Sequence, residues 1–242
     1  MQNLTLAETF SGIGGWNEAA RMAGDITPIW HCENDPNKIK YYEHRHPNVP
    51  NLGDIRNIQS APYADILTVS FPCTGFSTAG KGEGFENEGS KLWFEGERLI
   101  RIVRPRYIVI ENSPTLNRGG LVRILGSLAN LGYDAEWATL HGGQFGIQQL
   151  RKRLYCVAYA RENGQQSKYP KVGVFRRITP SIKDAALVYP GWRERRDIPQ
   201  PRTVRSAYDI PGLLHRLAGI GDAIIPLIGC YILTCIKLHA EQ

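Results

Sequence analysis

Short apolar runs alternate with longer helix-like stretches through the first two thirds of this 242-residue chain. The runs are rich in β-branched residues, and the stretches between them repeat their apolar residues at the helical period. This alternation is typical of an α/β fold with a mostly parallel sheet flanked by helices. The expected strands are Leu4–Thr9, Ile26–Cys32, Asp65–Ser70, Tyr107–Ile110, Ala135–Leu140 and Leu154–Ala158, and the expected helices are Trp16–Ala23, Asn37–His46, Leu92–Val103 and Leu121–Leu131.

In such a sheet, ligands bind beyond the carboxyl ends of the strands. The first strand ends in the glycine turn Phe10-Ser11-Gly12-Ile13-Gly14-Gly15, and glycines there let the backbone approach a ligand. The turn departs from the dinucleotide fingerprint G-x-G-x-x-G, because Asn17 stands three positions after Gly14. The turn alone therefore leaves a cofactor site and a plain tight turn equally open. Glu33, after the second strand, is placed to hydrogen-bond ribose hydroxyls, although its segment also reads as a helix N-cap through Asp35.

The third strand leads into Phe71-Pro72-Cys73-Thr74-Gly75-Phe76-Ser77, ahead of the glycine-rich segment Thr78–Ser90, which has no apolar period. Most lone cysteines are small buried hydrophobes. A cysteine at the end of a strand suits a nucleophile, and the loop after it could serve as a lid. Glu111 lies at the end of the next strand, and Arg151 and Arg153 open another with both side chains on one face.

The ordered set of motifs resembles the cytosine-C5 DNA methyltransferases, which use S-adenosylmethionine. The match covers residues 4–160 and about 211–236, in the family's order. It implies a Rossmann-like methyltransferase fold with a small irregular target-recognition insertion. The motifs are the glycine turn Phe10–Gly15, the acid Glu33, Gly53-Asp54-Ile55, Pro72-Cys73 with Phe76-Ser77, Lys91–Glu95, Glu111-Asn112, Phe145–Arg153 and Gly221–Ile224.

The resemblance also implies roles for individual residues. Cys73 attacks C6 of a flipped-out cytosine, and Arg151 and Arg153 are the cations that would favour its thiolate. Arg153 also hydrogen-bonds O2 of the base. Glu111 contacts N3 and the exocyclic amine, which requires a protonated carboxyl group, and burial raises a carboxyl pKa in that direction. No metal is implied, and the implied cofactor contacts are Phe10, Ser11, Gly12, Gly14, Gly15, Glu33, Asn34, Asp54, Pro72, Leu92, Asp222 and Ala223.

Four positions depart from the residues usual in the family. Thr74 stands in place of Gln, Ser113 in place of Val, Gln148 in place of Pro and Asp222 in place of Asn. The first three leave the chemical groups of the site intact. Asp222 adds a carboxylate near the carboxylate end of the cofactor, which opposes a direct contact there.

The positive charge of the chain lies in its C-terminal third. The net charge is +6 and the pI is about 9.1; residues 161–242 hold 13 basic and 7 acidic residues, whereas residues 1–160 hold 16 of each. Such a balance favours an anionic partner, or it is simply a solvated basic face. With the resemblance, it predicts a catalytic and cofactor-binding core over 1–160, a small target-recognition region over 161–210, and a C-terminal helix returning to the core over 211–242. The expected partner is double-stranded DNA, bound by a monomer.

Cysteine usage and hydropathy indicate the compartment. The five cysteines are an odd number without a C-x-x-C pair, which disfavours a disulfide framework and a zinc ribbon. No secretory signal is visible. The apolar run Ala223–Ile236 contains Pro226 and is shorter than the ~20 residues that a bilayer needs, so it predicts a buried helix. The protein is therefore expected in a reducing cytoplasm.

The sequence thus predicts a DNA (cytosine-5)-methyltransferase of the compact bacterial or phage type, of the kind found in restriction–modification. Two alternatives remain: a related branch of the family modifies tRNA with the same motifs, and an inactive relative could bind nucleic acid without turnover. The joint presence of Cys73, Glu111, Arg151 and Arg153 argues against the second. A nicotinamide dehydrogenase leaves Pro72-Cys73 unexplained.

Overall fold

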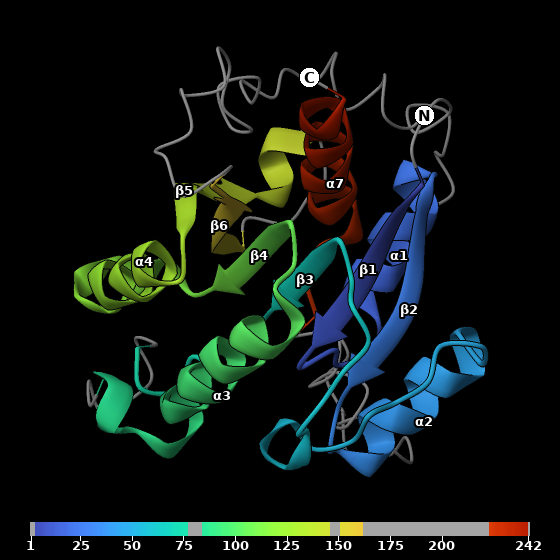
Figure 1. The fold of residues 1–242 in the computed structure, drawn as a ribbon, viewed down its shortest axis with the longest axis horizontal. Helices are drawn as coiled ribbons and strands as arrows, with labels where there is room; N and C mark the ends of the chain where they lie inside the picture. Colours follow the sequence, from blue (N-terminus) through green and yellow to red (C-terminus); the bar gives the residue numbers. More distant parts are fainter. Residues whose placement is uncertain (1–2, 77–83, 146–150, 162–222, 242) are drawn as a thin grey trace, which may run out of the picture.

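The computed structural model describes residues 3–76, 84–145, 151–161 and 223–241 (Figure 1). Within these residues one mixed six-stranded sheet is flanked by helices on both faces, as expected for the Rossmann-like methyltransferase fold. The strands are β1 (Leu4–Thr9), β2 (Ile26–Cys32), β3 (Ile66–Val69), β4 (Tyr107–Asn112), β5 (Tyr133–His141) and β6 (Lys152–Ala160). The α-helices are α1 (Gly15–Ala23), α2 (Pro36–Arg45), α3 (Glu88–Val103), α4 (Gly120–Asn130) and α7 (Pro226–Ala240), and the 3-10 helices are η1 (Ile55–Asn57), η2 (Gly84–Glu86), η3 (Pro114–Arg118) and η4 (Gly142–Phe145).

The strand order places the ends of four parallel strands at one edge. The order is β2-β1-β3-β4-β6-β5, in which β2, β1, β3 and β4 pair in parallel and β6 runs antiparallel to both β4 and β5. Asn112, the last residue of β4, pairs with Leu154 near the start of β6. The start of β6 therefore meets the carboxyl ends of β1 to β4, where ligands bind in such sheets.

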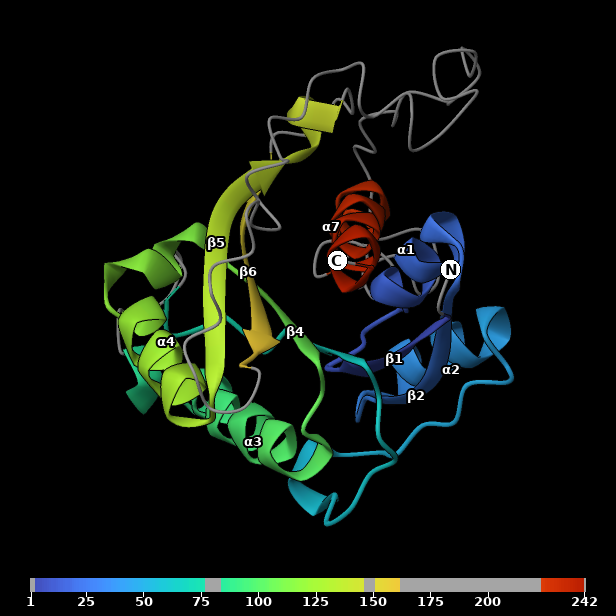
Figure 2. The same cartoon turned by 45° about the horizontal axis from the view of Figure 1, so that its top comes forward.

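Two apolar cores, one on each face of the sheet, hold the helices in place. α1 and α7 pack on one face, and α3 and α4 on the other (Figure 2). Successive residues of β1 divide between the two cores, since Leu6 belongs to the first and Ala7 to the second. Side chains alternate across a strand, so a strand buried on both faces must be apolar almost throughout.

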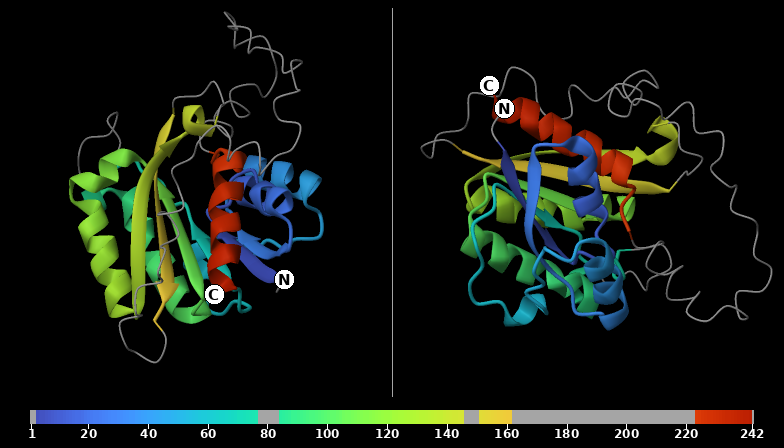
Figure 3. Two further views of the ribbon diagram at one scale, coloured as in Figure 1. Left: turned by 90° about the horizontal axis from the view of Figure 1, so that it is seen from above. Right: turned by 90° about the vertical axis from the view of Figure 1, so that its right-hand side faces the viewer.

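Helix α7 returns to the start of the chain and packs beside α1 (Figure 3). A side chain at Gly229 would place its Cβ 2.8 Å from the Cβ of Ala19, so glycine permits the close approach of the two helices. Lys237 Nζ then reaches the carbonyl of Gly24 at 2.8 Å and Asp25 at 2.9 Å. The buried helix predicted from the apolar run Ala223–Ile236 is confirmed.

Several of the predicted bounds differ from those of the structure, and two of these differences concern the site. The segment Thr78–Ser90 was predicted as a loop, but α3 begins at Glu88 because the Asn87 side chain accepts a hydrogen bond from Gly89 N–H and caps the helix. Strand β4 continues through Asn112, so Glu111 lies inside the strand, paired with Tyr155, and not after it.

Several predictions fall outside the described residues. These are the part of the proposed lid that covers 78–83, the residues Gln148 and Asp222, and almost all of the region 161–210. In the part of the chain that is described, no helix is long and apolar enough to cross a bilayer.

Candidate active site

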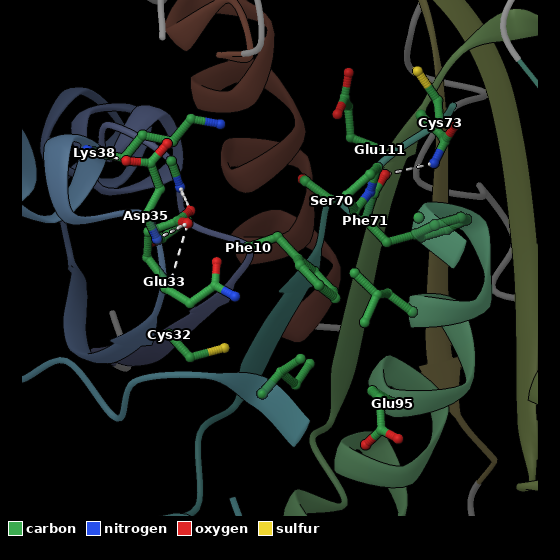
Figure 4. A pocket seen from close by; sticks show the side chains of 18 of the residues that line it. Phe10, Cys32, Glu33, Asp35, Lys38, Ser70, Phe71, Cys73, Glu95 and Glu111 are labelled. Atoms are coloured by element: carbon green, nitrogen blue, oxygen red, sulfur yellow. Dashed lines mark hydrogen bonds between the residues drawn. The ribbon is translucent and has the colours of Figure 1, made fainter. Parts of the chain in front are cut away.

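A cavity of about 780 Å³ opens at the carboxyl ends of the parallel strands, a size in the usual range for cofactor and ligand sites. Figure 4 shows Phe10 and Glu33 on one side of it and Cys73 and Glu111 on the other. All four predicted catalytic residues and ten of the twelve predicted cofactor contacts line the cavity; these are Cys73, Glu111, Arg151 and Arg153, with Phe10, Ser11, Gly12, Gly15, Glu33, Asn34, Asp54, Pro72, Leu92 and Ala223.

The remaining two predicted contacts are Gly14 and Asp222. Asp222 is not described. Gly14 is absent from the cavity wall and precedes α1 with φ +86°, a conformation that favours glycine. A Cβ at Gly14 would also lie 3.0 Å from the His46 ring and 3.1 Å from the Tyr42 ring. The need for glycine at this position thus has a structural cause in the turn itself.

The glycine turn and Glu33 are tied together by backbone hydrogen bonds. Gly12 N–H donates to Oε2 of Glu33 at 2.9 Å, and the N–H groups of Asn34 and Asp35 donate to its Oε1 at 3.0 Å each. A carboxylate offers about four acceptor positions, so three are taken by the protein and one is left for a ligand hydroxyl. The turn also holds Phe10 at φ +53°, in the left-handed region.

A buried carboxyl group, Glu8, occupies the N-terminus of α1. The Tyr42 hydroxyl donates to its Oε1 at 2.7 Å, and the backbone amides of Trp16 and Asn17 lie near enough to act on its pKa. In dinucleotide-binding folds the amides of this first helical turn bind phosphate. Because Glu8 takes that place, the chemistry of the site fits a nucleoside cofactor that carries no phosphate.

Burial raises the pKa of Glu8 to about 8. The sequence predicted no role for Glu8, although an acidic residue in a strand that otherwise holds only apolar residues and threonine is a signal for a buried polar contact. The rise in pKa is particular to Glu8. Asp54, another carboxyl group on the cofactor side of the cavity, has a lowered pKa. The Arg56 guanidinium, hydrogen-bonded to Asp54, holds the pKa of that carboxyl below its usual range, and Asn34 donates to it at 3.0 Å.

The five cysteines, all within the described residues, differ in exposure. Cys73 is partly exposed and lines the cavity, whereas Cys32, Cys156, Cys230 and Cys235 are buried. Burial raises the thiol pKa to about 12 for Cys32 and Cys156 and to about 11 for Cys230. Although Cys32 also reaches the cavity wall, its thiolate is costly to form. The geometry therefore favours Cys73 as the reactive thiol.

Glu111 and Arg153 form an ion pair in the wall of the cavity. Their Oε1 and Nε atoms are 3.1 Å apart, and the Glu111 side chain is 7% exposed. The antiparallel register of β4 and β6 brings the two residues to neighbouring positions at the same edge of the sheet. Burial alone would favour the protonated carboxyl group that was predicted, whereas the guanidinium favours the carboxylate.

Two further contacts join the catalytic side of the cavity to other elements. Arg151 donates a hydrogen bond to the carbonyl of Ala223, which connects the start of β6 to the segment before α7. Asn112 Nδ2 donates to the carbonyl of Phe71 at 3.0 Å, which ties the end of β4 to the residues before Cys73. The sequence predicted no separate role for Asn112 within the motif Glu111-Asn112, and this contact gives its amide a structural one.

Comparisons with known proteins identify the family of the chain. The family model of the C-5 cytosine-specific DNA methylase matches residues 4–195. The Type II methyltransferase M.Bsp6I of Bacillus sp. (strain RFL6) is 34% identical over 189 residues, which cover 75% of this chain and 59% of the relative. M.HgiBI of Herpetosiphon aurantiacus, also a Type II methyltransferase, is 34% identical over 164 residues, which cover 65% of this chain and 37% of the relative.

Solved structures share the fold. A crystal structure of the S. pombe Dnmt2 methyltransferase superposes with a TM-score of 0.55 at 23% identity, over 67% of this chain and 53% of the other. The Entamoeba histolytica methyltransferase EhMeth gives 0.58 at 19% identity, over 69% and 56%. The chain spans between about two fifths and three fifths of the curated relatives cited here. By the extent of the family match, the chain belongs to the C-5 cytosine-specific DNA methylase family.

Proposed function

We propose that this protein transfers a methyl group from S-adenosylmethionine to C5 of cytosine in double-stranded DNA. The observation that carries the proposal is the shared cavity, in which the partly exposed thiol of Cys73 lies with the Glu111–Arg153 pair and with a nucleoside-type cofactor pocket. The protein matches relatives named Type II methyltransferases. We therefore infer a sequence-specific enzyme of the restriction–modification kind.

Cytosine C5 is a poor nucleophile, and the proposed role of Cys73 is to change that. Its thiolate adds to C6 of the ring, which makes C5 an enamine carbon that can accept a methyl group. A base then removes the proton from C5, and elimination returns the thiol to Cys73 and the double bond to the ring. The bound cofactor supplies an electrophilic methyl group on a sulfonium centre.

Glu111 and Arg153 are placed to hold the base during this sequence. We infer that Glu111 hydrogen-bonds N3 and the exocyclic amine and that Arg153 hydrogen-bonds O2. When a base enters, it displaces the Arg153 guanidinium from the Glu111 carboxylate, which then takes up a proton from water and donates it to N3. Arg151 holds the segment before α7 against the cavity through Ala223, and its charge would favour the Cys73 thiolate.

The cofactor half of the cavity offers contacts for each part of an adenosyl group. We infer that Glu33 accepts from a ribose hydroxyl through its remaining acceptor position, that Phe10 packs on the adenine ring, and that Asp54 accepts from the exocyclic amine. The glycine turn would lie against the amino-acid portion, with Leu92 and Ala223 contributing further contacts. We propose these roles for residues that line one wall of one cavity.

The reacting carbon of cytosine is not accessible in a stacked duplex, so the base must be flipped into the cavity at a cost of a few kcal/mol.

We propose that the basic region 161–210 recognises the target and contacts phosphates, and that the protein binds DNA as a monomer. Phosphate contacts make affinity fall with salt. Neutralising Arg193, Arg195 and Arg196 should therefore flatten the salt dependence of DNA binding, and an unchanged slope would exclude this role.

A covalent trap tests the chemistry directly. DNA with 5-fluorocytosine at the target should capture the enzyme, because fluorine at C5 blocks the final elimination. We expect Cys73→Ser to abolish both the adduct and methyl transfer while S-adenosylhomocysteine still binds. An adduct that maps by mass spectrometry to another cysteine, or full activity in Cys73→Ser, would sink the proposal.

The target is tested with labelled cofactor on two substrates in parallel. A DNA library is methylated and read by bisulfite sequencing, and a tRNA pool is treated in the same way. We expect methylation of cytosines within one DNA sequence and none in tRNA. Label in tRNA alone would favour the tRNA methyltransferase, and no label in either would favour an inactive relative.

A further inference from the structure

Cys73 lies outside any helix or strand, so its position depends on its neighbours. Residues 73–76 form a turn that is closed by a hydrogen bond from Phe76 N–H to the Cys73 carbonyl at 2.9 Å. Pro72 restricts the backbone before the cysteine. A nucleophile must be held close to the reacting atom, and a misplacement of about 1 Å can cost about 10²-fold in rate. What fixes the turn after Cys73 therefore bears on the proposed reaction.

Side chains from the N-terminus of α3 hold this turn. Thr74 Oγ1 donates to Oδ1 of Asn87 at 2.5 Å, and Gly75 N–H donates to Oγ of Ser90 at 3.1 Å. The same Asn87 oxygen accepts from Gly89 N–H at 3.0 Å and so caps the helix. One oxygen atom thus joins the residue after Cys73 to the start of α3.

The packing around these contacts is close. A Cβ on Gly75 would lie 2.7 Å from both Ser90 Oγ and Asn87 Cβ, nearer than side-chain atoms normally approach. A Cβ on Gly89 would lie 3.3 Å from the Pro72 side chain and closer still to Thr74 Oγ1. Both sides of the contact therefore use glycine to let the turn and the helix meet.

Helix α3 is itself fixed against the rest of the molecule. The Trp93 ring packs on Phe71 with 5.7 Å between ring centroids. The Arg98 guanidinium donates to the carbonyls of Ile55 and Ile58 at 2.7 Å and 2.6 Å. A helix anchored in this way gives the turn a fixed reference, which a solvent-exposed loop would lack.

We propose that Thr74 and Asn87 are positioning residues, which hold the Cys73 turn against α3 so that the thiol faces the base. The inference rests on the proposed function and adds residues that do not react themselves. It also gives Thr74, which stands where Gln is usual in the family, a role that a short hydroxyl side chain performs. Thr74 is exposed at the cavity wall, so its substitution is not expected to unfold the protein.

The matched variants are Thr74→Val, which removes the hydroxyl and keeps the shape, and Thr74→Ser, which keeps the hydroxyl. We expect Thr74→Val to lower kcat at least about tenfold, with the KM for S-adenosylmethionine within twofold of the wild type, because positioning acts on the chemical step. Thr74→Ser should stay within threefold of the wild-type kcat. Asn87→Asp keeps the accepting oxygen and should resemble Thr74→Ser, whereas Asn87→Ala should resemble Thr74→Val. Equal kcat in Thr74→Val and the wild type would overturn the proposal.

A second measurement separates this inference from the proposed function, because it needs neither DNA nor cofactor. The rate at which iodoacetamide alkylates Cys73 is followed by mass spectrometry in the same variants. If the wild type proves inactive on all nucleic acids, a threefold or larger change of this rate in Thr74→Val, absent in Thr74→Ser, would support the positioning role although the proposed function fails. Equal rates in all three proteins would then overturn it.

Discussion

The two halves of the cavity are held in place by different means. In the cofactor half, backbone amides fix the glycine turn to the second strand, since Glu33 accepts three N–H groups, one of them from Gly12. In the catalytic half, side chains from distant elements fix the reactive groups, as Arg153 of β6 does for Glu111. The difference indicates that cofactor binding and catalysis can be altered separately.

Two buried carboxyl groups, Glu8 and Glu111, also differ in the groups that surround them. Glu8 and Glu111 both lie in strands, and both are almost inaccessible to solvent. Glu8 faces neutral donors, the Tyr42 hydroxyl and two backbone amides, and burial raises its pKa to about 8. Glu111 faces the guanidinium of Arg153 at 3.1 Å. The partner, and not burial alone, therefore distinguishes a structural acid from one proposed to exchange a proton.

The largest difference between the effects on catalysis and on cofactor binding is expected from Glu111→Ala. Removing a group that hydrogen-bonds and protonates the base should lower kcat by about 10²–10⁴-fold. The affinity for S-adenosylhomocysteine, measured by calorimetry, should stay within threefold, because Glu111 belongs to the other half. Glu95→Gln is the matched control, since Glu95 lines the same cavity but pairs with Arg98 at 2.7 Å. A comparable loss of kcat in the control, or a loss of cofactor affinity in Glu111→Ala, would contradict the inference that catalysis and cofactor binding can be altered separately.

Glu8→Gln should change how stability depends on pH. The folded-state pKa of Glu8 is raised to about 8 from an ordinary 4.5, so the folded protein holds this proton more tightly, and the stabilisation is full below pH 4.5 and is lost as pH rises through 8. Between pH 6 and pH 9 the wild type should lose about 2 to 3 kcal/mol of unfolding free energy through this group. Glu8→Gln should lack that loss.

Urea unfolding at the two pH values measures the effect of Glu8. Glu43→Gln, an exposed carboxyl group of α2, is the control and should follow the wild type. If the free energy of unfolding depends on pH in the same way in Glu8→Gln and in the wild type, the Glu8 carboxyl group does not titrate in this range. Burial would then not raise its pKa as proposed.

The sequence pattern predicted the fold where apolar runs have clear ends. The bounds of β1 and β2 agree with those expected, because the glycine turn Phe10–Gly15 follows the first run and the polar residues Glu33-Asn34-Asp35 follow the second. The start of α3 was not predictable in this way, since residues 88–91 hold no large apolar side chain and read as loop. Its beginning depends on the cap by Asn87, which a sequence cannot distinguish from an ordinary polar residue.

The site residues came from strand ends and from the resemblance, but their contacts did not. The Glu111–Arg153 pair joins residues 42 positions apart through an antiparallel register, and local patterns do not encode register between distant strands. The Thr74–Asn87 contact likewise depends on where α3 meets the turn. Glu8 was missed because a single acid in a strand shows neither its depth nor its partners.

The smallest effect among these predictions is expected from Glu33→Ala, which tests the cofactor half alone. Losing a hydrogen bond from a ribose hydroxyl to a charged group should weaken S-adenosylhomocysteine binding by about 1.5 to 3 kcal/mol, as measured by calorimetry. Asp35→Ala is the matched control, because Asp35 lines the same wall but its carboxylate caps α2 through Asn37 N–H at 2.8 Å. The control should bind S-adenosylhomocysteine within threefold of the wild type and should lose about 1 kcal/mol of stability instead. Unchanged affinity in Glu33→Ala would show that this carboxylate does not contact the cofactor. An equal loss of affinity in both variants would show that the loss comes from a general disturbance of the cavity wall and not from one lost acceptor.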